Sequence, residues 1–313
     1  MRLRVTDIRD EAEGIRSFDL RDPGGAELPP FEAGAHIEVT IEWPDGRTAA
    51  RHYSLLGDPR DQSRYRIAVL LEPAGRGGSR FMHERVETGS SLRVGSPANG
   101  FSLREADHTI LIAGGIGITP ILSMARTLGQ QGRSFEVHYA ARTPARMAFR
   151  DELEAVARGH AHFHVTGADP RRFDLAAILA APVHGARAYA CGPPAMIRAV
   201  SAASDQAGWP KDRIHFEGFG LHQRPGDRAI TVTLERSGLT VEVAPGVAVL
   251  DALLDAGVWA PHECRRGTCG SCMTRVVAGE PDHRDVCLPE ALRDQFICTC
   301  VSRARTGYLT LDL

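Results

Sequence analysis

Six of the seven cysteines in this 313-residue chain lie between Cys264 and Cys300, and this crowding limits how the C-terminal part can fold. A chain of this length can form a hydrophobic core without disulfides, so local crowding indicates a metal or cluster site. The segment Cys264-Arg-Arg-Gly-Thr-Cys269-Gly-Ser-Cys272, with Cys300 farther along, has the C-x4-C-x2-C…C spacing of plant-type [2Fe-2S] ligands. The sequence therefore predicts such a cluster, held by Cys264, Cys269, Cys272 and Cys300.

Two alternatives to this ligand set follow from the same residues. A structural zinc site fits less well, because zinc usually binds paired C-x2-4-C knuckles or added histidines. Cys298 is an alternative fourth ligand, since it lies two positions before Cys300. The remaining cysteines are expected to be buried small residues; these are Cys191, Cys287 and, if it is not a ligand, Cys298. His262 precedes the loop, but a Rieske site needs two Cys-x-His pairs, which the sequence lacks.

The composition narrows the class of protein. The formal net charge is -2, with 43% apolar and 24% charged residues, as in a soluble globular protein. Without an overall cationic field, nucleic acid and anionic membranes are not expected partners. The N-terminus lacks the apolar core of a secretory signal, and no apolar run reaches about 18 residues, so a cytoplasmic location is expected.

The hydrophobic pattern changes twice along the chain. Alternating segments separated by turn-rich stretches predict an antiparallel barrel or sandwich over residues 1–102. Short apolar strands that alternate with helical patterns predict a parallel α/β domain over residues 103–222. A polar stretch then resembles a linker, and residues 228–313 form a third predicted domain that contains the cysteine-rich loop.

The α/β segment contains two turns that could bind a nucleotide. The strand Thr109 to Ala113 runs into Gly114-Gly115-Ile-Gly117-Ile-Thr119-Pro120, where we expect Thr119 as the helix N-cap and Pro120 as the first helical residue. A glycine turn that leads into a helix N-terminus can hold a pyrophosphate. A later strand ends in Cys191-Gly192-Pro193-Pro194-Ala195-Met196, which opens a second helix at the same sheet edge. Arg142 follows another strand and is either near the ribose or simply solvated. The predicted nucleotide contacts are Gly114, Gly115, Gly117, Thr119, Pro120, Arg142, Cys191, Gly192, Pro193 and Met196.

The first domain contains two segments that suit a flavin phosphate. Arg51-His-Tyr53-Ser54-Leu55 places a cation, a ring and a hydroxyl along one strand, although alone it could be ordinary strand surface. Gly75-Arg76-Gly77-Gly78-Ser79 forms a basic loop rich in N–H groups before a short helical segment.

In their order along the chain, these motifs resemble the phthalate dioxygenase reductase and vanillate O-demethylase reductase family over essentially the whole length. The resemblance implies a multidomain protein: a ferredoxin-reductase-like antiparallel β-barrel with FMN, a parallel α/β domain for NADH or NADPH, and a β-grasp ferredoxin domain. It places Ile67, Ala68 and Val69 beside the flavin strand, Thr119 near the flavin ring, and Phe219, or alternatively Phe216, over the flavin. It also favours Cys300 as the fourth ligand, because Cys300-Val-Ser-Arg matches the family pattern. FMN is expected because relatives that bind FAD often carry the cluster at the N-terminus, and FAD is the alternative.

The resemblance and the cofactors together give an expected function. A nicotinamide delivers two electrons as hydride and a [2Fe-2S] cluster accepts one, so a flavin is needed between them. We expect a reductase that passes electrons from NAD(P)H through FMN and the cluster to a terminal Rieske oxygenase, with Thr119 and Cys191 as positioning candidates at the hydride-transfer site. The alternatives are a cytochrome P450 or a soluble ferredoxin as acceptor, or a zinc-stabilised or redox-sensing module without enzymatic activity.

Overall fold

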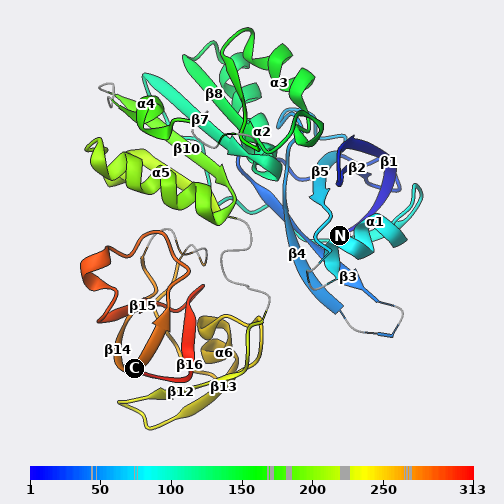
Figure 1. Ribbon diagram of the computed structural model, residues 1–313. Helices are drawn as coiled ribbons and strands as arrows, with labels where there is room; N and C mark the ends of the chain where they lie inside the picture. The colour runs from blue at the N-terminus through cyan, green and yellow to red at the C-terminus, as the bar shows by residue number, and fades with distance from the viewer. Residues whose placement is uncertain are drawn as a thin grey trace. The chain divides into compact units, whose positions relative to one another are not determined.

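The computed structural model describes residues 1–313 except 44, 47, 74, 76, 168, 170–172, 181–184, 219–225, 264, 266, 268 and 269. The described chain groups into two compact units, Met1–Glu217 and Gly218–Leu313. The first unit contains an antiparallel and a parallel sheet, and the second contains a mixed sheet (Figure 1). The predicted fold class is therefore confirmed, while the predicted domain borders stay predictions. No described helix is both long and apolar enough to cross a membrane.

The antiparallel sheet of the first unit closes into a barrel. Its described strands are β1 (Arg2–Ala12), β2 (Ile15–Arg21), β3 (His36–Glu42), β4 (Thr48–Ser54), β5 (Tyr65–Leu70) and β6 (Ser91–Val94), in the order β4-β3-β6-β1-β2-β5. Alternation places Ile37, Val39 and Ile41 in the core, where each is fully buried. The Leu56 N–H donates to the Arg66 carbonyl at 3.0 Å, which joins the chain after β4 to β5. Helix α1 (Gly78–Arg85) follows β5.

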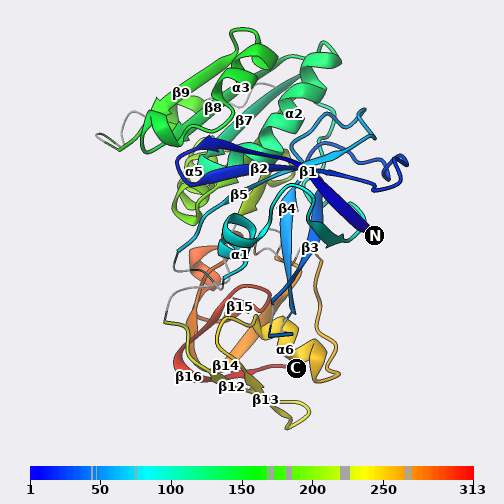
Figure 2. The same cartoon turned by 90° about the vertical axis from the view of Figure 1, so that its right-hand side faces the viewer.

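The parallel sheet contains β7 (His108–Gly114), β8 (Phe135–Ala141), β9 (Ala161–Val165), β10 (Ala186–Gly192) and β11 (Ile214–Gly218). Their order is β11-β10-β7-β8-β9, so the chain reverses its direction of travel across the sheet at β7 and β10. The helices are α2 (Ile118–Gln130), α3 (Arg150–Ala157), α4 (Leu175–Leu179) and α5 (Pro194–Gln206). Figure 2 shows α2 and α3 lying together beside β7 and β8, as right-handed crossovers from those strands require. Short 3-10 turns occur at η1 (Gly115–Gly117), η2 (Pro144–Arg146), η4 (Lys211–Arg213) and, in the second unit, η5 (Glu290–Leu292).

The predicted start of the helix after β7 is wrong. The glycine turn is itself helical, as the 3-10 turn η1, and leads into α2 with Gly117 at the N-cap position. Thr119 therefore lies inside the first turn, where its hydroxyl donates to the Ile116 carbonyl at 3.0 Å instead of capping the helix. Pro120 is also inside this turn, where its missing N–H is tolerated because the first N–H groups of a helix have no partner within it.

The second unit has the mixed sheet expected of a β-grasp fold. Its described strands are β12 (Ile230–Leu234), β13 (Thr240–Val243), β14 (Met273–Asp282), β15 (Phe296–Cys298) and β16 (Arg303–Leu311), in the order β13-β12-β16-β14-β15. Strands β12 and β16 pair in parallel, and the other printed pairs are antiparallel. Helix α6 (Val249–Asp255) buries Val249, Leu250 and Leu253 in the same core as Val232.

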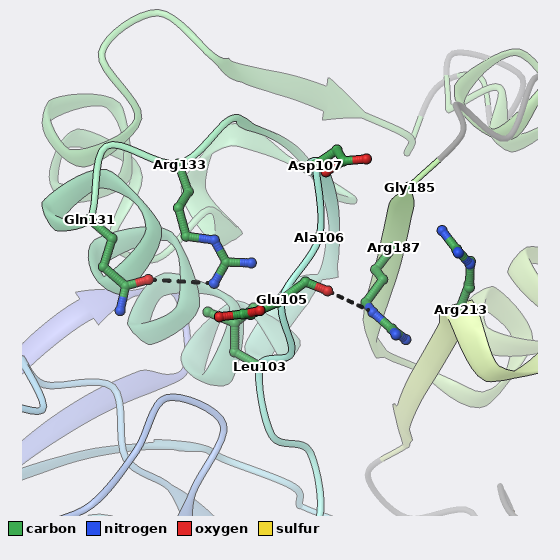
Figure 3. A pocket seen from close by; sticks show the side chains of 9 residues that line it. All are labelled: Leu103, Glu105, Ala106, Asp107, Gln131, Arg133, Gly185, Arg187 and Arg213. Atoms are coloured by element: carbon green, nitrogen blue, oxygen red, sulfur yellow. Dashed lines mark hydrogen bonds between the residues drawn. The ribbon is translucent and has the colours of Figure 1, made fainter.

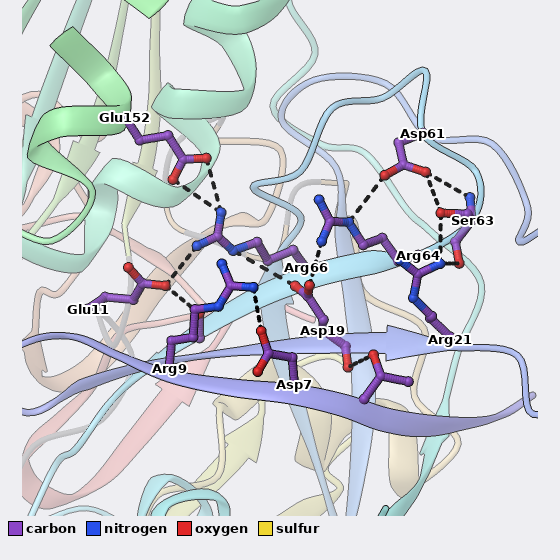
Figure 4. Close-up of polar contacts among 12 residues, drawn as sticks. Asp7, Arg9, Glu11, Asp19, Arg21, Asp61, Ser63, Arg64, Arg66 and Glu152 are labelled. Atoms are coloured by element: carbon purple, nitrogen blue, oxygen red, sulfur yellow. Dashed lines mark hydrogen bonds and ion pairs between the residues drawn. The ribbon is translucent and has the colours of Figure 1, made fainter. Parts of the chain in front are cut away.

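Within the first unit, ion pairs join the barrel to the helical layer of the parallel sheet. Arg66 on β5 contacts Glu11 at 2.7 Å and Glu152 of α3 at 3.0 Å (Figure 4). Its guanidinium also lies 5.1 Å from the centre of the Phe149 ring, and its side chain is only 12% exposed. Arg126 of α2 forms a second ion pair with Glu152. The barrel and the parallel sheet are thus held in one packed unit.

Candidate functional site

The carboxyl ends of β7 and β10 lie next to each other where the strand order reverses. Ala113 pairs with Cys191, so the glycine turn after β7 meets the residues after β10. A Cβ added to Gly117 would lie 2.1 Å from the Cys191 carbonyl oxygen, and one added to Gly114 would lie 2.6 Å from the Met196 sulfur. Only glycine allows this approach, whereas a Cβ on Gly115 would meet nothing within 4 Å. Open-sheet α/β proteins bind ligands at such a reversal, and the start of the helical segment after β7 suits a pyrophosphate.

The other predicted nucleotide contacts lie at the same sheet edge but differ in exposure. Cys191 and Thr119 are buried, at 0% and 2% exposure, while Pro193 at the start of α5 is exposed. Arg142 is exposed after β8, and its carbonyl accepts the Gly167 N–H at 2.9 Å. Because Gly114 pairs with Ala140, β8 brings Arg142 to this edge. The roles of Thr119 and Cys191 in positioning the nicotinamide stay predictions.

Arg51 and the glycine loop lie together and form a cradle for an anion. A Cβ on Gly78 would lie 2.5 Å from Arg51 Nε, so the arginine side chain occupies the space beside the first residue of α1. Gly77 has φ 82°, which favours glycine. The Ser79 hydroxyl accepts the Glu72 N–H at 3.0 Å and, with Gly75 packed against Glu72, closes the loop. The cation and the helix N-terminus together fit a flavin phosphate, and Arg76 lies outside the described residues.

After Arg51, strand β4 carries two residues with hydroxyl groups, Tyr53 and Ser54. Burial raises the pKa of Tyr53 to about 12, despite the nearby Arg51 charge, so the phenol stays protonated at neutral pH. Ser54 is 4% exposed, and its Oγ has no hydrogen-bond partner within the described part of the chain. An unsatisfied buried hydroxyl costs about 1–3 kcal/mol, so this atom fits a hydrogen bond to a ligand.

The predicted residues of β5 lie beside this strand. Ile67 and Val69 are buried in the barrel core, so their backbone rather than their side chains can face a ligand. Ala68 between them points to the other face of the strand and is 5% exposed. Strand β5 also passes close to η1, so the strands predicted to bind flavin and the turn predicted to bind nucleotide approach each other.

In the second unit, two of the four predicted cluster ligands are described, and their sulfur atoms meet. Cys272 Sγ and Cys300 Sγ are 3.2 Å apart, and these residues are 2% and 3% exposed. Contacts with the sulfur atoms of Cys298 and Cys300 lower the pKa of Cys272 to about 3, which favours a thiolate, the form that binds iron. Cys264 and Cys269 lie outside the described residues.

The alternative ligand Cys298 has a different environment. Its Sγ is 3.7 Å from that of Cys287, and its thiol contacts raise the pKa of Cys298. The raised pKa of Cys298 and the lowered pKa of Cys272 come from the same thiol contact, so the choice of Cys300 as the fourth ligand stays a prediction. His262 contacts the Ala260 carbonyl at 2.8 Å, as expected of a loop residue.

Two further residues, one beside the glycine loop and one at the end of β11, gave no signal in the sequence. Trp43 lies 3.7 Å from a Cβ placed on Gly77, and its ring packs edge-on against Phe81 of α1. Glu217, at the end of β11, is 2% exposed. Of the two aromatic candidates for covering the flavin, Phe216 is half-buried on β11, and Phe219 lies outside the described residues.

A cavity of about 680 Å³ lies at the opposite, amino-terminal edge of the parallel sheet (Figure 3). Two of its three arginines already have partners: Arg133 donates to the Arg104 carbonyl at 3.0 Å, and Arg187 donates to that of Glu105 at 2.9 Å. These hydrogen bonds connect neighbouring loops. The cavity lies away from the glycine turn that begins at Gly114. It therefore adds nothing to the candidate site.

Comparisons with known proteins agree with the kinds of domain described above. The family model of the 2Fe-2S iron-sulfur cluster binding domain matches residues 232–305, and that of the oxidoreductase NAD-binding domain matches residues 111–202. The phenoxybenzoate dioxygenase subunit beta of Ectopseudomonas oleovorans is 43% identical in an alignment of length 316, which covers 99% of this chain and 97% of that protein. The vanillate O-demethylase oxidoreductase of Pseudomonas sp. (strain HR199 / DSM 7063) is 39% identical, with 99% and 98% covered.

A further relative and a solved structure extend the comparison. The heme-dependent oxidative N-demethylase beta subunit of Ectopseudomonas mendocina (strain ymp) is 40% identical, with 99% of this chain and 98% of that protein covered. The solved structure of phthalate dioxygenase reductase, described as modular for electron transfer from pyridine nucleotides to [2Fe-2S], has a TM-score of 0.76 and 40% identity, with 100% and 98% covered. This chain therefore belongs to the family of phthalate dioxygenase reductase and vanillate O-demethylase oxidoreductase, which are NAD(P)H-dependent iron–sulfur oxidoreductases.

Proposed function

We propose that this chain is the reductase component of a two-component oxygenase or demethylase system. It takes electrons from NADH or NADPH and passes them, with FMN and a [2Fe-2S] cluster bound, to a terminal oxygenase of the Rieske type. The observation that carries the proposal is that one chain holds both ends of such a route, the glycine-built cleft at Gly114–Gly117 and the Cys272–Cys300 sulfur pair. Relatives that are dioxygenase and demethylase subunits support an oxygenase as the partner. FMN rather than FAD rests on the order of the motifs, and a cytoplasmic location stays a prediction.

The residues of the first unit bind and orient the two organic cofactors. The N–H groups at the start of α2 bind the dinucleotide pyrophosphate, and Gly117 keeps the two walls of the cleft in contact. Arg51 and the N-terminus of α1 bind the flavin phosphate, while Ser54 offers its hydroxyl to the flavin. A bound flavin supplies the chemistry that accepts the electron pair of a hydride and releases it one electron at a time.

The residues of the second unit hold the cluster and exclude water from it. Cys272 and Cys300 are buried, and Cys264 and Cys269 complete the proposed ligand set. The chain after Cys300 is braced by Asp285, whose carboxylate accepts the Ser302 hydroxyl at 3.1 Å and the Leu288 N–H at 2.9 Å. This brace fixes the turn that carries Cys300, as supporting contacts around a metal site do.

Cofactor analysis of the purified chain tests this proposal first. A visible spectrum, acid-released flavin, and iron and sulfide assays should identify FMN and a [2Fe-2S] cluster. Bound zinc without iron or inorganic sulfide would contradict the electron-transfer function.

The acceptor is tested separately by coupled turnover. NADH oxidation is measured with equal amounts of a Rieske oxygenase, a cytochrome P450 and a soluble ferredoxin. The Rieske protein should give the fastest turnover that depends on the acceptor. Preference for the P450 would retain the reductase and reject the Rieske partner, and the heme-dependent N-demethylase relative makes this comparison necessary.

A further inference from the structure

Two neighbouring strands of the parallel sheet carry metal-binding side chains on one face. Strand β8 carries Glu136 and His138, and strand β9 carries His162 and His164. Side chains two positions apart share a face of a strand. The register pairs His138 with His162, so all four side chains lie on the same face. None of them belongs to the glycine turns or the cysteine loop described above.

The four side chains are also in contact. His138 Nε2 lies 3.6 Å from Glu136 Oε1, and His138 Nδ1 lies 3.3 Å from His164 Nε2. The rings of His138 and His162 stack with centres 4.8 Å apart and planes 19° apart. One potential ligand atom from each of Glu136, His138 and His162 lies within 4.8 Å of the other two.

The hydrogen bonding of His138 leaves a nitrogen that suits a cation. A neutral imidazole carries one proton, and with that proton on Nδ1 the ring donates to His164. In that tautomer Nε2 presents its lone pair toward the Glu136 carboxylate, so two acceptors face each other; in the other tautomer Nε2–H faces the carboxylate, and a bound cation would displace that proton. His138 is 8% exposed, and its Nε2 has no hydrogen-bond partner in the described chain. A cation between these two atoms would satisfy both.

We propose that Glu136, His138 and His162 form a binding site for a divalent cation of the zinc class, with His164 orienting His138. Two imidazoles and a carboxylate are a ligand set that zinc uses in open sites, and a hydrogen bond from the second imidazole nitrogen is the usual support of a ligand histidine. Zinc bonds of about 2.0–2.1 Å require ligand atoms about 3.3 Å apart. Rotation of the exposed His162 ring closes the remaining distance. The bound ion would link β8 to β9 and stabilise the folded state by mass action.

Zinc titration of the intact protein, loaded with flavin and cluster, tests this site. Isothermal titration with ZnCl2 is compared for the wild type, His162→Ala and Glu136→Gln. The wild type should bind one zinc ion, and each variant should bind it at least about tenfold more weakly. His160→Ala is the matched control, because His160 is an exposed histidine just before β9 that is outside the ligand set, and it should bind as the wild type does. No saturable binding by the wild type, or equal affinity in His162→Ala, would overturn the proposal.

X-ray absorption at the zinc edge identifies the ligands. The zinc-loaded wild type should show nitrogen and oxygen neighbours at about 2.0–2.2 Å. Sulfur neighbours at about 2.3 Å would place the ion on cysteines instead, and this result would also overturn the assignment.

Discussion

Replacing Ser54 by alanine should change two measurable properties in opposite directions. The hydroxyl is buried and lacks a hydrogen-bond partner in the described structure, so the flavin-free protein bears a desolvation penalty. That penalty is about 1–3 kcal/mol, and removing the hydroxyl should raise the free energy of unfolding of the flavin-free protein by up to that amount. If the flavin accepts or donates the missing hydrogen bond, its loss should cost about 0.5–1.5 kcal/mol of flavin binding, or roughly twofold to tenfold in Kd.

The two effects are measured on flavin-free protein prepared identically for each variant. Urea denaturation gives the free energy of unfolding, and quenching of free flavin fluorescence on FMN titration gives the Kd. Thr109→Val is the matched control, because Thr109 Oγ1 is another buried hydroxyl without a partner in the described residues, at the amino-terminal end of β7. It should stabilise the protein and leave the flavin Kd unchanged. A less stable Ser54→Ala protein with unaltered FMN affinity would refute the reasoning.

Three further predictions follow from the sites. Cys272→Ser should leave flavin reduction by NADH intact and slow cytochrome c reduction at least about tenfold. Cys300→Ser should lose the visible absorption of the cluster, whereas Cys298→Ser should retain it. Gly117→Ala should destabilise the protein by about 1–3 kcal/mol in urea denaturation and raise the KM for NADH, because its Cβ would overlap the Cys191 carbonyl, whereas Gly129→Ala in α2 should not. The pKa of His215 is lowered from 6.5 to about 4, mainly by burial and further by the Arg104 and Arg187 charges. Between these two values His215 is therefore protonated in the unfolded chain but neutral in the folded chain. Folding stability should thus fall by about 1–2 kcal/mol between pH 7 and pH 5, and His215→Phe should flatten this slope in urea midpoints.

Each of these has a contrary result. Unchanged cytochrome c reduction by Cys272→Ser would remove the cluster from the route, and loss of the cluster in Cys298→Ser would make Cys298 the ligand. A Gly117→Ala protein with normal stability and KM would show that the cleft walls are not in contact. An identical pH slope in His215→Phe would mean that other groups cause the acid sensitivity.

Features set by local pattern were predictable from the sequence. The strand expected at Thr109 to Ala113 is β7 (His108–Gly114), and that expected at Phe135 to Ala140 is β8 (Phe135–Ala141). Short apolar runs bounded by turn residues define such strands well. The cysteine spacing likewise identified the domain that matches the 2Fe-2S family model, since ligand spacing is a local property of the chain.

Features set by contacts between distant segments were not predictable. The sequence gives no sign that Ser54 lacks a partner, because that depends on how β4 meets β5. The histidine cluster depends on the register that pairs His138 with His162. The error at Thr119 has a local cause instead: threonine before a proline suits an N-cap, but the preceding glycine turn is already helical, so the helix starts at Ile118.

The contact between Gly117 and the Cys191 carbonyl has a consequence for how nucleotide enters and leaves. Gly117 touches the Cys191 carbonyl through its backbone, and the strands next to the contact, β7 and β10, are hydrogen-bonded to each other, so the sheet holds the two segments together. A nucleotide bound at this turn would therefore enter a site whose walls are already in place, and its exchange would be limited by dissociation rather than by a hinge motion. Selectivity between NADH and NADPH would then come from exposed side chains around the site, such as Arg142, which can vary without disturbing the backbone contact.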